Sequence, residues 1–414
     1  MSKKYVILVF LAALIFYISG CGTSKTGTDS VINASFDKQD YKKITSANNQ
    51  LGFQLLNRVK PNDKGNTLFS PTSLFIALSM VYNGAEETTK DEISQILHLE
   101  NKRSTDLNRA NASLLSSLME QPEGIQLQIG NSIWLNDQFH FQEAFTDKNT
   151  DYFNAEIEEI DINNPDAAQK MNDWIKKSTN NKITEITDSP LDPNLVTMLI
   201  NAIYFNGQWT YAFNEAQTTN RNFHLENGDT KQVPMMLLKE KLNYLENKYV
   251  QAVSLPYSEE KKMSMNIFLP KKNTSLSELK TKLTSDIWQQ WQSQFQEEEG
   301  TVQLPKFQIE YETTLNDALQ QLGMTEAFDK QNANFQKMIQ ENNQLWISDI
   351  KQKTYIEVTE QGTEAAGVTS IGMETTSAPI DPPFHMEVNR PFFFTITDHE
   401  TNSILFMGTI YNPS

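Results

Sequence analysis

Apolar residues recur at helical spacing through the first half of the chain. Leu51, Leu55, Leu56 and Val59 follow this spacing, and Pro61 ends the run. Further helices are expected from Pro71 through Leu74, Leu78 and Val81 to Gly84, near Lys90–Leu99, and after Asn164, where Met171, Trp174 and Ile175 would be buried. The pattern predicts that helices gather in this half.

Strand patterns dominate the second half. Residues 195–205 form a nearly unbroken apolar run around Asn201, which is typical of a central strand covered on both faces. Residues 346–360 alternate, with Ile350 and Ile356 on one face and Lys351 and Lys353 on the other. Further strands are expected at 264–270, 392–397 and 405–410. Helices followed by strands, without regular βαβ alternation, indicate the α+β class.

The segment from Glu360 to Glu374 has the composition of a loop and the periodicity of a strand. Every second residue from Thr363 to Met373 is small or apolar, whereas Glu364 and Glu374 both fall on the opposite face. A loop of about 25 residues is unusual unless it is functional. We interpret the segment as a chain with two states, one a loop and one a half-buried strand.

Composition and charge narrow the classes of function. Hydrophobic residues make up 38% of the 414 residues and aromatic residues 10%, enough for a sizeable core. No repeat and no second low-complexity break occurs before residue 362, so one continuous domain is expected over 44–414. The formal charge of −17 argues against nucleic acid, heparin-like polyanions and anionic membrane surfaces as partners.

The first 21 residues form a separate unit. Lys3 and Lys4 precede an apolar run from Val6 to Ile18, which is short for a stable membrane-spanning helix. The run ends in Ile-Ser-Gly followed by Cys21, the only cysteine, so no internal disulfide can form. This ending resembles the lipobox of bacterial lipoproteins, in which the cysteine thiol receives the lipid. An ordinary signal peptide with an incidental cysteine is the alternative.

Lipidation would place the protein at a bacterial cell envelope. Residues 1–20 would be removed as a signal peptide, and residues 21–43, rich in Gly, Ser, Thr and Asp, would form a flexible tether. Gly22 rather than aspartate follows the cysteine, which in a Gram-negative host favours the outer membrane; the outer membrane or the cell surface is therefore the expected location.

The sequence contains no recognisable enzyme motif. A nucleophile elbow, a His-Glu-x-x-His helix, a P-loop and a Gly-x-Gly-x-x-Gly fingerprint are all absent. The five histidines are scattered without the spacing of metal ligands. We therefore expect no enzyme activity, no metal site and no cofactor.

Seven short blocks occur in order along about 370 residues. They are 66–73 (NTLFSPTS), 201–209 (NAIYFNGQW), 233–236 (VPMM), 322–324 (LGM), 360–366 (EQGTEAA), 389–392 (NRPF) and 405–408 (LFMG). Together they resemble the serpin family of serine protease inhibitors, whose reactive loop begins with Glu-x-Gly-Thr-Glu-Ala-Ala.

The resemblance implies one serpin domain of three β-sheets and eight to nine helices, with an exposed reactive loop over about 360–388. It also implies suicide-substrate inhibition of serine-type endopeptidases, with cysteine endopeptidases as further candidate targets. The protease would form an acyl-enzyme, and the cut loop would enter the large sheet as a new strand before deacylation. Such insertion requires alternate side chains without charge, as the periodicity from residue 363 provides. A monomer is expected.

Two sets of residues take their roles from the resemblance. The hinge comprises Glu360, Gly362, Thr363, Glu364, Ala365, Ala366 and Gly367. Inhibitory members avoid charge at the first inward position, which is Thr363 here; Val368 is bulkier than the usual alanine but faces outward. The shutter, at which the large sheet opens, comprises Ser70, Ser73, Asn201 and Gln352. Gln352 replaces the family's histidine; its amide can donate and accept hydrogen bonds but does not titrate.

The expected scissile bond follows from spacing within the family. Counting fifteen residues from Gly362 places it at Thr376–Ser377, and counting back from Asn389 leaves a window from Met373 to Ile380. This small, polar stretch suits elastase-like or subtilisin-like proteases with shallow pockets. No Lys or Arg occurs between Glu360 and Val388, so trypsin-like proteases are not expected targets.

Two alternatives stay open. A non-inhibitory serpin acting as a surface-binding or storage protein would share the fold, although this hinge follows the inhibitory pattern. An unrelated lipoprotein that binds ligands or surfaces would account for the N-terminal unit alone. A covalent protease complex that survives SDS would distinguish an inhibitor from both.

Overall fold

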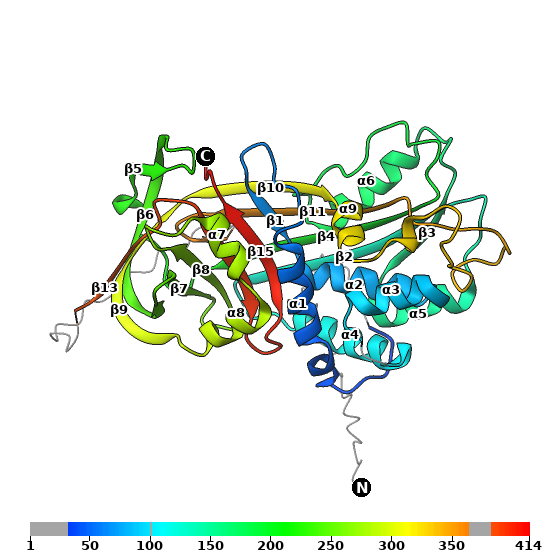
Figure 1. The fold of residues 1–414 in the computed structure, drawn as a ribbon, viewed down its shortest axis with the longest axis horizontal. Coiled ribbons are helices and arrows are strands. Elements are labelled where there is room, and N and C mark those ends of the chain that lie inside the picture. The colour runs from blue at the N-terminus through cyan, green and yellow to red at the C-terminus, as the bar shows by residue number, and fades with distance from the viewer. Residues whose placement is uncertain (1–31, 100–101, 364–381) are drawn as a thin grey trace, which may run out of the picture. The chain divides into compact units, whose positions relative to one another are not determined.

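The computed structural model describes residues 32–99, 102–363 and 382–414 (Figure 1). The expected lipid-attachment residue Cys21, hinge residues 364–367 and the bond Thr376–Ser377 lie outside these ranges. None of the helices in the described ranges combines the length and apolar character needed to cross a membrane.

The described residues contain nine α-helices, consistent with the α+β class. They are α1 (Thr45–Leu55), α2 (Pro71–Tyr82), α3 (Glu87–Ile96), α4 (Ser104–Met119), α5 (Glu143–Phe153), α6 (Ala167–Ser178), α7 (Leu276–Lys282), α8 (Ser285–Gln292) and α9 (Asn316–Gln321). The first six precede residue 197, so the helices gather where helical spacing predicted them. Short 3-10 helices add η1 (Asp40–Lys43), η2 (Glu215–Gln217) and η3 (Glu326–Phe328).

The large sheet has six strands. Their order is β10 (Phe307–Thr314), β11 (Asp349–Val358), β12 (Gly362–Thr363), β4 (Thr197–Gln208), β2 (Ile125–Asn136) and β3 (Glu156–Ile160). The two-residue strand β12 separates β11 from β4 at one end only. Over the rest of their length β11 and β4 pair directly, in parallel.

Nine further strands form one hydrogen-bonded network. Its path is β1 (Thr67–Phe69), β15 (Ile404–Ile410), β14 (Phe392–Asp398), β8 (Met263–Pro270), β7 (Val250–Tyr257), β6 (Thr230–Glu246), β9 (Gln296–Pro305) and β13 (Phe384–Glu387), with β5 (Thr219–His224) paired to β6. The end of β6 pairs with β7, and its earlier residues pair with β9 and β5. The resemblance implies three sheets, whereas hydrogen bonding among the described residues gives the large sheet and this one network, because β6 pairs with both β7 and β9.

Helix α2 is covered around its whole circumference. The Ser70 hydroxyl caps it by accepting the Ser73 N–H over 3.1 Å, and Pro71 occupies the first turn. Its 12 residues are all buried, against β2, β4, β15 and the neighbouring helices. The apolar stripe in the sequence predicted this helix, but the stripe understates its burial because the residues between the stripe positions are covered as well.

Helix α6 and the residues after it cover one face of the large sheet. Trp174 packs edge-on against Trp134 of β2, with ring centroids 6.3 Å apart. Residues 183–187, which we call the crossing segment, then pass over β11. There Lys351 Nζ donates to Ile186 O over 3.1 Å, and Lys353 Nζ donates to Glu185 O over 2.7 Å. The charged face of β11 is therefore covered, and Lys353 is only 9% exposed.

The packed part of the chain begins before residue 44. Residues 40–43, which composition places in the tether, form η1. Tyr41 is buried, and its N–H donates to Ser113 Oγ of α4 over 3.2 Å. The Ser113 hydroxyl in turn donates to Lys38 O over 2.9 Å.

Candidate functional site

The expected hinge begins inside the large sheet. β11 ends at Val358, the chain reverses, and Gly362 and Thr363 return as β12. Thr363 is paired antiparallel with Val358 of β11 on one side and with Gly207 of β4 on the other. The alternating pattern predicted a strand to residue 360, but β11 ends at Val358. The last residues of the pattern belong to this reversal.

Main-chain carbonyls fix the reversal to the segment that follows β4. Trp209 donates twice, from its backbone N–H to Gln361 O and from its indole Nε1 to Thr359 O, both over 2.9 Å. The Phe213 N–H donates to Glu360 O over 2.8 Å. These bonds hold the chain path between β11 and β12.

The Glu360 carboxylate is buried and ion-paired. It accepts Lys306 Nζ and Thr218 Oγ1, each over 2.7 Å. Burial alone would raise the pKa of Glu360, but the hydrogen bonds from Lys306 and Thr218 outweigh it and hold the pKa below its usual value. The charge is therefore kept, and it ties the reversal to β9 and β10 through the residue that joins them, Lys306.

Gly362 occupies a place that only glycine can fill. A Cβ at this position would collide with the carbonyl oxygen of Gly207 and lie 2.8 Å from the Gln208 Cα. Both obstacles are backbone atoms of β4 and cannot move aside as a side chain can. The glycine of the hinge block is thus explained by the close approach of two backbones.

Thr363 points into an apolar cluster. It is fully buried, and its hydroxyl lies 2.6 Å from the Tyr257 hydroxyl. The Tyr257 ring stacks on Trp209 with centroids 4.4 Å apart and contacts Phe205 edge-on at 4.9 Å. Burial raises the pKa of Tyr257 far above its usual value, so its hydroxyl stays neutral. A charged side chain at position 363 would find no counter-charge in this cluster.

The four expected shutter residues meet in the middle of the large sheet. Gln352 Oε1 accepts the Ser70 N–H over 2.8 Å, and Gln352 Nε2 donates to Ser70 O over 3.1 Å and to Asn201 Oδ1 over 2.5 Å. Asn201 Nδ2 donates to Ser73 O over 3.1 Å and also contacts the Ser73 hydroxyl. The amide in place of histidine is hydrogen-bonded at both ends, so it joins α2, β4 and β11 without a titrating group.

Asn131 is a member of this cluster that the sequence analysis missed. Asn201 Nδ2 donates to Asn131 Oδ1 over 2.7 Å. Asn131, Asn201 and Gln352 stand opposite one another on β2, β4 and β11, so they form one polar row across the sheet. A signal was present: among every second residue from Ile125 to Leu135, Asn131 is the single polar one.

The downstream end of the loop is held in the other network. β13 pairs in parallel with β9, and the Phe384 ring stacks on Tyr244 with centroids 4.1 Å apart. A Cβ on Gly300 would overlap the Phe384 ring, so the ring lies directly on the β9 backbone. The His224 N–H donates to Asn389 O over 2.8 Å. Residues 364–383 therefore join two anchors in two different sheets.

The described residues offer no metal centre. Nowhere in these ranges do three or more His, Cys, Asp or Glu side chains gather so as to hold an ion.

Comparison with known proteins agrees with this geometry. The profile of the family described as "Serpin (serine protease inhibitor)" matches residues 46–413. An uncharacterized serpin-like protein of Methanosarcina mazei is 31% identical over 99% of this chain and 98% of its own length. Tengpin, a thermophilic serpin solved in its native state, is 30% identical, with a TM-score of 0.82 over 92% of this chain and 96% of its own. Human thyroxine-binding globulin, solved in complex with thyroxine, is 26% identical, with a TM-score of 0.82 over 91% of this chain and 100% of its own. On these grounds the chain belongs to the serpin family, whose members are generally protease inhibitors rather than enzymes.

Proposed function

We propose that this protein inhibits serine-type endopeptidases by trapping them during cleavage of its reactive loop, and cysteine endopeptidases by the same route. The observation that carries the proposal is the two-sided pairing of Thr363, which already sits between β11 and β4 as the first inserted residue. The hinge is thus a strand already begun, which the residues after Thr363 can extend.

The two pairings share one register. Thr363 stands opposite Gly207 and Val358, so a further six residues of antiparallel strand bring residue 369 opposite 207 − 6 = 201 and 358 − 6 = 352. These are Asn201 and Gln352, which face each other now. An inserted strand can therefore pair with β4 and with β11 at once, without a change in the register between them. The inward positions on the way, Ala365, Gly367 and Thr369, are all small and uncharged.

Insertion exchanges one parallel ladder for two antiparallel ones. It separates the seven residue pairs of β4 and β11 and breaks the bond from Gln352 to Asn201. In return each strand gains a new partner, and antiparallel pairing is slightly more stable per residue than parallel pairing. Each added backbone hydrogen bond contributes about 1 kcal/mol net, so a longer inserted segment drives the reaction further.

The chemistry belongs to the protease. Its serine hydroxyl adds to the carbonyl carbon of Thr376, and the bond to Ser377 breaks. The hydroxyl proton passes through the protease's own base to the leaving amine, and an ester to Thr376 remains. Inhibition results when the loop enters the sheet before water hydrolyses this ester.

Loop composition favours proteases with shallow primary pockets. The window from Met373 to Ile380 contains no Lys or Arg, so an acidic primary pocket finds no partner there. Elastase-like and subtilisin-like enzymes are therefore the proposed targets, and trypsin-like enzymes are not.

Incubation with subtilisin, elastase and trypsin tests the proposal. We expect an SDS-stable complex with the first two enzymes, and a released C-terminal fragment whose sequence begins at Ser377. Trypsin should give no complex. Cleavage of the loop by every protease without any SDS-stable complex would refute inhibition by trapping.

A non-inhibitory serpin is the second candidate. It is favoured by one finding, the similarity in fold to thyroxine-binding globulin. Such a protein would carry or store a ligand and would behave in the same experiment as an ordinary substrate.

We also propose that Cys21 carries a lipid that holds the protein, as a monomer, at the surface of a bacterial cell envelope. The support is the Ile18–Cys21 pattern after a short apolar run. Cys21→Ala should move the protein from the membrane to the soluble fraction. A variant that stays fully membrane-bound would rule out this anchor.

A further inference from the structure

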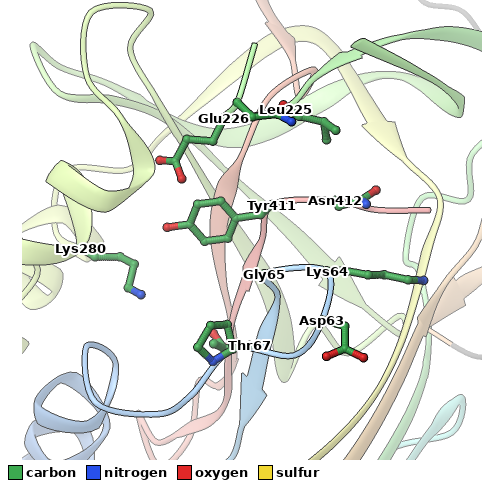
Figure 2. A pocket seen from close by; sticks show the side chains of 11 residues that line it. Asp63, Lys64, Gly65, Thr67, Leu225, Glu226, Lys280, Tyr411 and Asn412 are labelled. Carbon is green, nitrogen blue, oxygen red and sulfur yellow. The ribbon is translucent and has the colours of Figure 1, made fainter. Parts of the chain in front are cut away.

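A second candidate site lies far from the hinge, beside the end of β15. It is a cavity of 640 Å³ with walls from the turn before β1, the turn between β5 and β6, α7 and the residues after β15 (Figure 2). This volume is within the range of pockets that hold small molecules. Leu225, Pro61 and the Tyr411 ring supply its apolar surface.

Two hydrogen-bond donors at one end of the cavity lack protein partners. Among the described residues, neither Lys280 Nζ nor the Tyr411 hydroxyl has a hydrogen bond or an ion pair, and both residues are half-buried. Burial lowers the pKa of Lys280 and raises the pKa of Tyr411 to about 12. Both groups are therefore partly shielded from water and have no hydrogen-bond partner among the described residues, so a ligand that accepts from them would be stabilised there.

An acceptor faces the same end. Figure 2 shows the Glu226 carboxylate, the Tyr411 hydroxyl and the Lys280 ammonium on one side of the cavity. Glu226 acts electrostatically on both other groups, yet it forms no ion pair with Lys280 within 4.0 Å in the described structure. A carboxylate and an ammonium thus lie on the same side of the cavity without forming an ion pair.

We propose that this cavity binds a zwitterionic ligand of amino-acid or dipeptide size. The ligand carboxylate accepts from Lys280 and Tyr411, its ammonium donates to Glu226, and its side chain packs on Leu225 and Pro61. A phosphate would be repelled by Glu226, and a simple carboxylate or a simple amine would leave one protein charge without a partner.

The other face of α7 provides a comparison. A cavity of 420 Å³ there is lined by Lys282, Tyr249 and Trp291 among others. Lys282 already pairs with Glu278 over 2.8 Å and lies over the Tyr249 ring. Because that lysine is satisfied by the protein itself, it gives no comparable reason for a ligand.

Isothermal titration of the whole protein with L-leucine tests the inference. We expect saturable binding with a dissociation constant of about 1 mM. N-acetyl-L-leucine lacks the ammonium, isoamylamine lacks the carboxylate, and inorganic phosphate lacks both features; each should bind at least about tenfold more weakly. Binding of any of the three as tight as that of L-leucine would overturn the zwitterionic assignment.

Variants assign the binding to this cavity. Lys280→Met and Glu226→Gln should each weaken L-leucine binding about tenfold, whereas Lys282→Met, two residues away on the same helix, should bind as wild type. Lys280→Gln is a second variant, should the methionine disturb folding. Absence of saturable binding, or equal binding by wild type, Lys280→Gln and Glu226→Gln, would overturn the proposal. Thr363→Arg should bind L-leucine normally, since this site does not depend on the hinge.

Discussion

The two anchors of the reactive loop are built from different kinds of contact. Upstream, Gly362 and Thr363 are held by backbone pairing on both sides and by one buried hydroxyl contact. Downstream, Phe384 stacks on Tyr244 and lies on the backbone of Gly300, after two prolines that fix their own φ angles. Any small residue after Thr363 can repeat the backbone pairing of the upstream anchor. The contacts of the downstream anchor, by contrast, fit only the Phe384 ring. The upstream anchor is thus suited to extension and the downstream anchor to staying in place.

The largest effect is expected from a charge in the upstream anchor. Thr363→Arg would place a guanidinium beside Tyr257 and Trp209 without a partner, so residue 363 should leave its pairings in the uncleaved protein. Its return to the sheet should then slow insertion sharply. Each 1.4 kcal/mol added to the insertion barrier lowers the ratio of the insertion rate to the deacylation rate about tenfold. We expect cleaved protein with little SDS-stable complex on gels after incubation with subtilisin. Thr363→Ser, which keeps the hydroxyl, should trap as wild type; equal trapping by the arginine variant would contradict the assigned hinge.

A change in the downstream anchor should affect stability more than trapping. Phe384→Ala removes a buried ring, so the free energy of unfolding should fall by about 3 kcal/mol. Urea denaturation measures this loss, and Phe384→Leu should show a smaller one. The ratio of complex to cleaved product should change little. A large drop in that ratio would mean that the downstream anchor also takes part in insertion.

A change in the polar row of Asn131, Asn201 and Gln352 should have a smaller effect on stability than the loss of Phe384. Gln352→Ala leaves the Ser70 N–H and Asn201 Oδ1 without a partner, at about 2 kcal/mol of stability. It also removes a side-chain link between β4 and β11, so the native protein should lose inhibitory activity faster on storage. Thermal melting and timed activity assays measure both effects. A variant as stable and as durable as wild type would show that the row does not hold the sheet closed.

The smallest effect concerns the acid response of the turn. The pKa of Glu360 is lowered in the folded protein, so its stabilising contribution is present above the unfolded pKa and is lost as pH falls through the folded value. The difference in unfolding free energy between wild type and Glu360→Gln should be about 1 kcal/mol near neutral pH, because Lys306 is partly exposed. It should shrink below about pH 4. A difference that grows on acidification would contradict the sign of this pKa shift.

Local patterns were enough to predict much of the fold. The run around Asn201 predicted β4, and Pro71 with its apolar stripe predicted α2. Roles for the hinge and shutter residues could be proposed because the family resemblance rests on short blocks such as 360–366. In these cases the relevant signal lies within a few residues along the chain.

Other features depend on contacts between distant segments. The crossing segment over β11 joins residues 185–186 to Lys351 and Lys353, and nothing in the alternation of β11 indicates that its charged face is covered. The role of Asn131 can be recognised only from its pairing with Asn201 on another strand. The cavity at Tyr411 draws its walls from four separate parts of the chain. Periodicity reports which face is apolar, but not which partner covers it.

The lysine under the crossing segment has a consequence for how the sheet can open. Lys353 Nζ lies 3.1 Å from Glu310 and 3.3 Å from Glu312, both on β10, and it donates to the neutral carbonyl of Glu185. If β10 and β11 move together away from β4, as the proposed insertion requires, the lysine travels with both of its counter-charges. Of the contacts of Lys353, only the hydrogen bond to this neutral oxygen has to break. The separation of β11 from β4 thus breaks no ion pair of Lys353. The Glu185 carbonyl that is left behind can accept a hydrogen bond from water.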